Sequence, residues 1–145
     1  MNEALVKAAK IGFASQYTFF LKAQFYHWNV EGIHFQELHA LFERIYTEVY
    51  ESIDDFAEKI RACGGYAPSS NTRFNMLSVI DDATEVTPPE AMVAELLQDA
   101  EHMVTIIKRV YDIAEAEGEH GFSNFLAERM DAFRKHAWML RATAK

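Results

Sequence analysis

Apolar residues recur at every third or fourth position along most of the chain, and this spacing constrains the fold more than any other feature of the sequence. The longest such pattern runs from about His34 to Cys63, and a pair of glycines ends it. Its apolar positions are Leu38, Phe42, Ile45, Val49, Ile53, Phe56 and Ile60. They fall on one side of an α-helix, whereas the alternation that predicts strands is nearly absent. The pattern therefore predicts an all-α protein built from long helices.

Three further segments have helical spacing. They run from about Glu3 to Trp28, from a start at Thr87-Pro88-Pro89-Glu90 to about Ala114, and from about Ser123 to Ala142. In the first of these, the polar positions Glu3, Lys7, Lys10, Thr18 and Lys22 form one narrow stripe, so we expect that helix to be largely buried. The start at Thr87 is a capping-box sequence with proline at the first helical position.

A long connection, residues 65–86, separates the second helix from the third. A helix of about 28 residues is roughly 42 Å long, and a connection of this size can run its whole length. The third helix then starts beside the start of the second, which is the ferritin-like variant of a four-helix bundle. We expect a short helix over Arg73–Ile80 within the crossover, and a single domain over residues 1–145.

The second helix carries the most informative polar residues. Wound at 100° per residue, His39, Glu43, Asp54 and Glu58 form one stripe beside the apolar face. Imidazole and carboxylates together suit Fe(II), Mn(II) or Zn(II). A solvated face is the more common meaning of carboxylates at this spacing, so both interpretations stay open at this point.

Distance limits where a metal can bind. His39 and Asp54 are 15 residues apart, or roughly 22 Å along a helix, too far to share one ion within a subunit. Two copies of this helix packed antiparallel about a two-fold axis near Glu48 would bring the His39/Glu43 end of one to the Asp54/Glu58 end of the other. We therefore expect any metal site to lie between subunits. His27, just before a short turn, should lie close to His39.

Other histidines fit a metal site less well. The strings Glu31-Gly32-Ile33-His34 and Glu117-Gly118-Glu119-His120 match the Glu-x-x-His pattern of di-iron helical bundles. Both contain glycine and sit at predicted helix breaks, so we interpret them as turn residues. A heme-binding protein or a bundle with its own internal di-iron site is thereby disfavoured. His102 and His136 are lone helix histidines, for which we expect structural roles.

The composition restricts partners and compartment. The net charge of −8 disfavours binding to phosphate backbones and favours cations. The first residues lack the apolar stretch of a secretory signal, and no apolar run approaches the roughly 20 residues of a membrane span. The single cysteine, Cys63, allows no internal disulfide. We expect a cytoplasmic protein.

The stretch FYHWNVEGIHFQELHALFERIYTEVYESIDDFAEKIRACGG, Phe25 to Gly65, strongly resembles the signature region of the Dps miniferritins. The segment KHAWMLRA, Lys135 to Ala142, is similar to that family's last helix. The resemblance covers essentially the whole chain. It implies a dodecameric hollow shell in which His27 and His39 of one subunit, with Asp54 and Glu58 of its two-fold mate, bind ferrous iron.

The resemblance also has departures. The family commonly has aspartate where this chain has Glu43, which bears on how a second iron is held. Trp28 follows the first ligand as in the family, where it implies an electron or radical relay; packing at the helix junction is the alternative. Asn124 stands where many relatives have a pore aspartate. The acids near the start of the last helix, Glu115, Glu117, Glu119 and Glu128, are the candidates for lining pores through which iron enters.

These features together predict a ferroxidase and iron-storage cage, a homo-oligomer that oxidises Fe(II) with hydrogen peroxide at di-iron sites and holds no heme. A cage that only sequesters metal or protects DNA is one alternative. DNA binding itself is not expected, because neither end of the chain carries a basic run. A plain helical interaction module, monomeric or dimeric, is another alternative.

Overall fold

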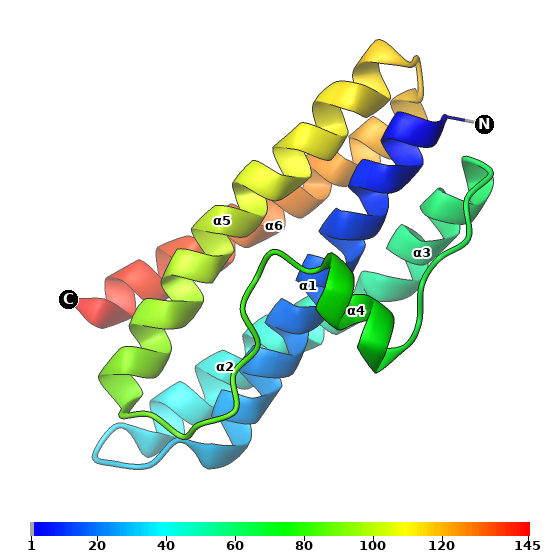
Figure 1. Ribbon diagram of the computed structural model, residues 1–145. Coiled ribbons are helices and arrows are strands. Elements are labelled where there is room, and N and C mark those ends of the chain that lie inside the picture. The colour runs from blue at the N-terminus through cyan, green and yellow to red at the C-terminus, as the bar shows by residue number, and fades with distance from the viewer. Residues whose placement is uncertain (1) are drawn as a thin grey trace.

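The computed structural model describes residues 2–145, within which the chain forms helices and no strand. The helices are α1 (Glu3–Asn29), α2 (Phe35–Glu51), α3 (Ile53–Ala62), α4 (Asn71–Leu77), α5 (Pro89–Ala116) and α6 (His120–Ala144). α2 and α3 follow each other as one rod, so that α1, α2–α3, α5 and α6 make a four-helix bundle (Figure 1). The all-α bundle predicted from the sequence is confirmed.

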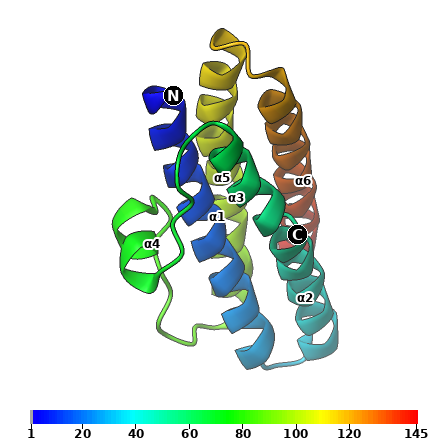
Figure 2. The ribbon, with the colours of Figure 1, turned by 90° about the vertical axis from the view of Figure 1, so that its right-hand side faces the viewer.

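α1 is the central helix of the bundle. It packs against α2, α3, α4 and α5, which is why it has buried residues all around its circumference. Its C-terminal end and the turn into α2 lie at one end of the bundle, opposite the turn between α5 and α6 (Figures 1 and 2). The prediction of a largely buried first helix is correct, but Lys22 does not belong to an exposed stripe. Its side chain is 1% exposed, because Glu95 and Asp99 of α5 bind the ammonium group.

The second predicted helix is interrupted at Ser52. The Ser52 N–H donates to the carbonyl of Val49 at 3.1 Å instead of to the residue four back, and the Ser52 hydroxyl donates to the same carbonyl at 2.7 Å. Gln16 of α1 donates its side-chain amide to that hydroxyl at 2.8 Å. Serine hydroxyls that bond to the preceding turn bend helices. The continuous helix expected here was therefore wrong at one residue, although α2 and α3 keep one direction.

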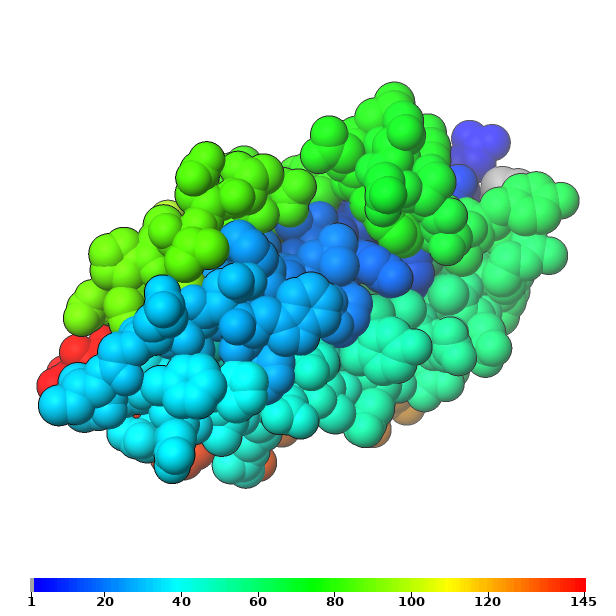
Figure 3. Space-filling view, turned by 90° about the horizontal axis from the view of Figure 1, so that it is seen from below, coloured from blue at the N-terminus to red at the C-terminus, as the bar shows by residue number. Residues whose placement is uncertain are grey.

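The crossover between α3 and α5 runs along α1, and Figure 3 shows it over one side of the molecule with a strip of α1 visible between it and α2. It contains α4, which starts two residues earlier than predicted and ends at Leu77. The early start is explained by a cap, because the Ser70 hydroxyl accepts the N–H of Arg73 at 3.1 Å. α4 lies on the side of α1 away from α6 (Figure 2). The predicted long crossover with a short helix is confirmed.

The helix after the crossover begins at Pro89, and no side chain caps it. The predicted capping box at Thr87 was wrong. A residue that precedes proline is disfavoured from helical geometry, so Pro88, before Pro89, is held in an extended conformation with ψ of 153°. α6 begins at His120, three residues before the predicted Ser123. The turn before it uses Gly118 at φ of 75°, a conformation that glycine adopts without strain.

A buried polar cluster joins α6 to the middle of the bundle. Arg129 donates both terminal guanidinium nitrogens to the Glu48 carboxylate and its Nε to the Gln16 side chain. His136 Nε2 contacts the same carboxylate at 2.7 Å. Burial by itself raises the pKa of Glu48, but the hydrogen bonds from His136 and Arg129 outweigh burial and lower the pKa to about 2. His136 is therefore a packing histidine bound to a charge, and Glu48 holds α2 against α6.

We predict that Glu48→Ala lowers the free energy of unfolding at pH 7 by roughly 3 kcal/mol, because it leaves the buried Arg129 without its counter-ion. The matched control is Asp112→Ala, which removes a carboxylate from the exposed Lys108–Asp112 pair and should cost at most about 0.5 kcal/mol. Urea unfolding at one protein concentration measures both.

The difference in the free energy of unfolding between wild type and Glu48→Ala should depend on pH. The Glu48 pKa is lower in the folded chain than in the unfolded one. The ionised carboxylate of Glu48 therefore adds to the free energy of unfolding above pH 4.5, and this stabilisation is lost as pH falls toward about 2. The stability gap between wild type and Glu48→Ala should narrow over that range. A gap that stays constant from pH 6 to the acid limit of folding would contradict the pairing.

Candidate metal centre

Two histidines meet where α1 ends and α2 begins, and each holds the other in place. The Nδ1–H of His27 donates to the backbone carbonyl of His39 at 2.6 Å, and the Nδ1–H of His39 donates to the carbonyl of His27 at 2.7 Å. The rings stack with centroids 3.7 Å apart. A carbonyl oxygen can only accept, so both rings carry a proton on Nδ1, and in the neutral ring the lone pair that can bind a metal is on Nε2. Histidines that bind metals are oriented in this way.

Glu43 completes a group of three possible ligands. It lies one turn beyond His39 on α2, and its Oε1 is 3.9 Å from His27 Nε2. One ligand atom from each of His27, His39 and Glu43 lies within 4.8 Å of the other two. His27 is buried, His39 is half-buried and Glu43 is exposed, so the group faces outward from the subunit. Two imidazoles and one carboxylate with an open side form a partial site for Fe(II), Mn(II) or Zn(II).

The other two predicted ligands lie elsewhere. Asp54 and Glu58 are exposed residues of α3, beyond the break at Ser52, and they are not part of the group around His27. Asp54 instead borders a hollow of about 390 Å³ with Tyr50 of α2 and Tyr17 of α1. Within one subunit the structure therefore brings together three of the five predicted ligands and leaves two apart, as the axial distance required.

Aromatic rings support the histidine pair. Phe35 stacks on His39 with centroids 4.9 Å apart, and Tyr46 meets the His27 ring edge-on at 5.3 Å. Both contacts were missed by the sequence analysis. Phe35 lies four residues before His39 on one helix, a spacing that brings side chains into contact and was available in the sequence. The Tyr46 contact crosses between helices and has no local sequence signal.

Trp28 has little to pack against within the subunit. Its side chain is 64% exposed even though it follows the buried His27. An indole that packed the helix junction would be covered by it. Trp28 therefore lies on the outer surface of the subunit, next to His27 in the sequence.

The predicted pore acids divide into two sets. Glu115 lies beside the turn from α5 to α6, where it accepts hydrogen bonds from the Ser123 hydroxyl at 2.7 Å and from His120 Nδ1 at 2.8 Å. These hydrogen bonds lower the pKa of Glu115, so its carboxylate stays ionised. Glu117 and Glu119 flank Gly118 in the turn. Glu128 lies eight residues into α6 from His120 and is exposed, so it does not belong to the turn.

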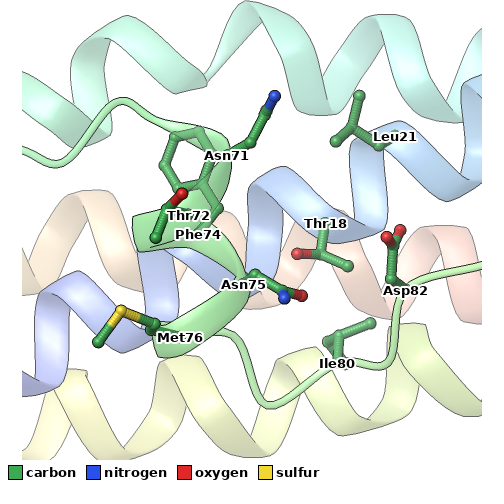
Figure 4. Close-up of a pocket in the computed structure, with 9 residues that line it drawn as sticks. All are labelled: Thr18, Leu21, Asn71, Thr72, Phe74, Asn75, Met76, Ile80 and Asp82. Carbon is green, nitrogen blue, oxygen red and sulfur yellow. The ribbon is translucent and has the colours of Figure 1, made fainter.

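A hollow of about 520 Å³ between α1 and α4 does not compete with this site. Figure 4 shows its walls, with Thr18 and Leu21 from α1, the side chains of α4, and Ile80 and Asp82 from the segment that follows. Asp82 is its only ionisable side chain, and the rest of the lining is apolar or neutral. The ionisable group around His27 therefore remains the best candidate for chemistry within residues 2–145.

No helix within residues 2–145 combines the length and the apolar character needed to cross a membrane.

Comparison with known proteins agrees with the fold. The family model described as the ferritin-like domain matches residues 11–145. DNA protection during starvation protein 2 of Bacillus anthracis is 33% identical over 142 residues, which are 98% of this chain and 97% of that protein. The structure of Dps from Staphylococcus aureus is similar with a TM-score of 0.93 at 27% identity, covering 99% of this chain and 96% of that one. The structure of Dps from Vibrio cholerae O1 has a TM-score of 0.94 at 26% identity, covering 99% of this chain and 91% of that one.

We predict that His39→Gln weakens Co(II) binding by at least about tenfold, because it removes one ligand and the hydrogen bond that orients the group around His27. Competition against a chromophoric chelator measures the affinity. His102→Gln is the matched control, since His102 is exposed on α5 and lies outside the three-ligand group. Equal affinities for the two variants would show that the histidine pair is not a metal site.

Proposed function

The chain belongs to the ferritin-like family as a miniferritin of the Dps type, and from this premise we propose that it forms a cage whose subunits oxidise Fe(II) and store the Fe(III) produced. The Vibrio cholerae relative is described as a member of a broad superfamily of ferritin-like diiron-carboxylate proteins. That description supports iron as the metal here. In this proposal iron is the substrate and the cargo of the protein.

The observation that carries the proposal is the mutual locking of His27 and His39. Each ring uses its Nδ1–H to bond to the other's backbone, which leaves both Nε2 atoms available as ligands, that of His27 3.9 Å from Glu43 Oε1. The hydrogen bonds hold the junction of α1 and α2 together, and the ring nitrogens that they leave unused are available as ligands beside the exposed Glu43. Nitrogen and oxygen ligands with open positions suit a ferrous ion that must meet an oxidant.

A second subunit completes the site in this proposal. A two-fold axis near Glu48 sets Asp54 and Glu58 of one copy against His27 and His39 of the other, and the pair of subunits then has two equivalent sites. The exposure of both carboxylates on α3 supports this arrangement, since they are free to contact another chain. Glu43, exposed and one methylene longer than aspartate, reaches the second iron position. Twelve such subunits form the cage, as the resemblance to Dps proteins implies.

Hydrogen peroxide is the proposed oxidant. Two Fe(II) ions each lose one electron, the O–O bond breaks, and two protons are taken up, so that two Fe(III) ions and two water molecules form. Paired irons supply both electrons together, and no hydroxyl radical is released. When only one iron is bound, Trp28 supplies the second electron in this proposal, which its exposure and its position next to His27 in the sequence support.

Iron enters through acidic pores near the turn between α5 and α6 in this proposal. Glu115 is held ionised by Ser123 and His120, and Glu117 and Glu119 adjoin it, so these three acids are better placed than Glu128 to attract Fe(II). The acidic character of the chain, with a net charge of −8, favours cations throughout the cage.

The alternative is a cage without catalysis, which sequesters metal or protects DNA. The name of the Bacillus anthracis relative, DNA protection during starvation protein 2, supports DNA protection as the alternative function. The same ligands would bind metal in either case, so only the kinetics of iron oxidation distinguish the two functions. The net negative charge argues against direct contact with phosphate backbones at ordinary salt.

The proposal predicts rapid oxidation when protein loaded anaerobically with Fe(II) receives hydrogen peroxide, followed by ferric absorbance. His27→Ala/Asp54→Ala should reduce the rate to that of Fe(II) in buffer and should raise the yield of trapped hydroxyl radical. His34→Ala/Asp55→Ala is the matched control, because it removes an exposed histidine and an exposed aspartate near the same positions. If the wild-type protein oxidised Fe(II) no faster than buffer, the ferroxidase proposal would be wrong and the non-catalytic cage would be the remaining function.

A further inference from the structure

A second charged cluster lies between α1 and α5, away from the histidine pair. Lys22 is fully covered there, with 1% of its side chain exposed. Its Nζ is 2.9 Å from Glu95 Oε1 and 2.6 Å from Asp99 Oδ2. Glu95 and Asp99 are four residues apart on α5, so both carboxylates face the same point on α1. The ammonium group occupies that point.

Neighbouring side chains act on both carboxylates that bind the ammonium. The Tyr26 hydroxyl donates to the second oxygen of Glu95, which fixes the carboxylate in its present orientation. Asp99 is followed three residues later by His102, which lies on the same side of α5 and whose charge lowers the pKa of Asp99 when it is protonated. The two carboxylates of Glu95 and Asp99 are the groups here that can bind a cation, and carboxylates suit Mn(II).

The cluster depends on its central positive charge. Burial by itself lowers the pKa of Lys22, but the hydrogen bonds to Asp99 and Glu95 outweigh burial and raise the pKa above its usual value. Burial also raises the pKa of Asp99, and Lys22 only partly offsets this. Without a cation between them, the two carboxylates would repel each other in a poorly solvated place.

We propose that the Lys22 ammonium is a built-in cation that closes a carboxylate site between α1 and α5 to divalent metal. The geometry supports this substitution, because the ammonium nitrogen, 2.9 Å from Glu95 Oε1 and 2.6 Å from Asp99 Oδ2, occupies the place where an ion bound by both carboxylates would sit. Lys22 thereby determines where a subunit can bind divalent metal. The carboxylates between α1 and α5 are already occupied by the ammonium, and only the group around His27 at the surface stays open to an ion. This inference rests on the proposed function for its meaning, since it explains why iron is directed to the site between subunits.

A simple structural staple is the competing explanation. In that case the ion pairs only hold α1 against α5, and removing Lys22 weakens the fold with no gain of metal binding. The two explanations differ in whether a variant without the ammonium gains divalent-metal binding. Lys22→Ala removes the ammonium and most of the stem, so it leaves both the negative charge and the space for an ion.

The test uses full-length protein carrying His27→Ala/His39→Ala, which removes the histidine pair, with Mn²⁺ as the probe. Equilibrium dialysis and thermal melting compare this background with the same protein carrying Lys22→Ala. The proposal predicts at least about tenfold tighter Mn²⁺ binding in the Lys22→Ala protein, and a melting temperature that Mn²⁺ raises more than in the background. Adding Glu95→Gln/Asp99→Asn to Lys22→Ala should abolish the gain.

Mn²⁺ binding no tighter with Lys22→Ala than without it would overturn the proposal. So would a gain that survives Glu95→Gln/Asp99→Asn. If Lys22→Ala does not fold by itself, folding in Mn²⁺ supports the proposal, and folding only on addition of Glu95→Gln/Asp99→Asn contradicts it. Lys22→Gln, which keeps more of the side-chain packing, provides the same comparison. Because the histidine pair is absent throughout, failure here leaves the ferroxidase proposal standing, and failure of ferroxidase activity does not affect this result.

Discussion

The pair of hydrogen bonds between His27 and His39 is the interaction on which the candidate site depends. It joins the last turn of α1 to the first turn of α2 through side chains that also have to serve as ligands. The short turn between the two helices would by itself permit many relative rotations. Because each ring bonds to the other's backbone, one rotation is selected, a proton is fixed on each Nδ1, and one ligand atom of each ring lies within 4.8 Å of one from Glu43.

Two buried charge clusters hold the rest of the bundle around that junction. On the side of α5, Lys22 binds Glu95 and Asp99, one turn before the histidine on α1. On the side of α6, Arg129 binds Glu48 and Gln16, and Gln16 in turn bonds to Ser52 at the break between α2 and α3. α1 is thus fixed on two of its sides by directional contacts, whereas apolar packing alone would tolerate small rotations. A ligand group at the end of such a helix needs this precision, because a small rotation would move His27 away from His39.

The sequence predicted the parts of the structure that depend on local spacing. The four rods, the long crossover, and the meeting of His27, His39 and Glu43 all follow from helical periodicity and a short turn. Some predictions were wrong because a residue's partner is distant in sequence. Lys22 looks exposed until Glu95, 73 residues away, neutralises it. The capping box at Thr87 was wrong because consecutive prolines delay the helix, a local effect that the sequence contained. The place of Asp54 and Glu58 in a site stays a prediction, because it concerns a second subunit.

Mixing two inactive variants tests most directly whether the site is shared between subunits. One carries His27→Ala/His39→Ala and the other Asp54→Ala/Glu58→Ala, and the two are unfolded together and reassembled. In a mixed two-fold pair, one site loses all four ligands and the other keeps all four. Random assembly should therefore restore about one quarter of the wild-type rate of iron oxidation, although each variant alone is inactive. Mixed assemblies of normal mass with no recovered activity would contradict a site built from two subunits.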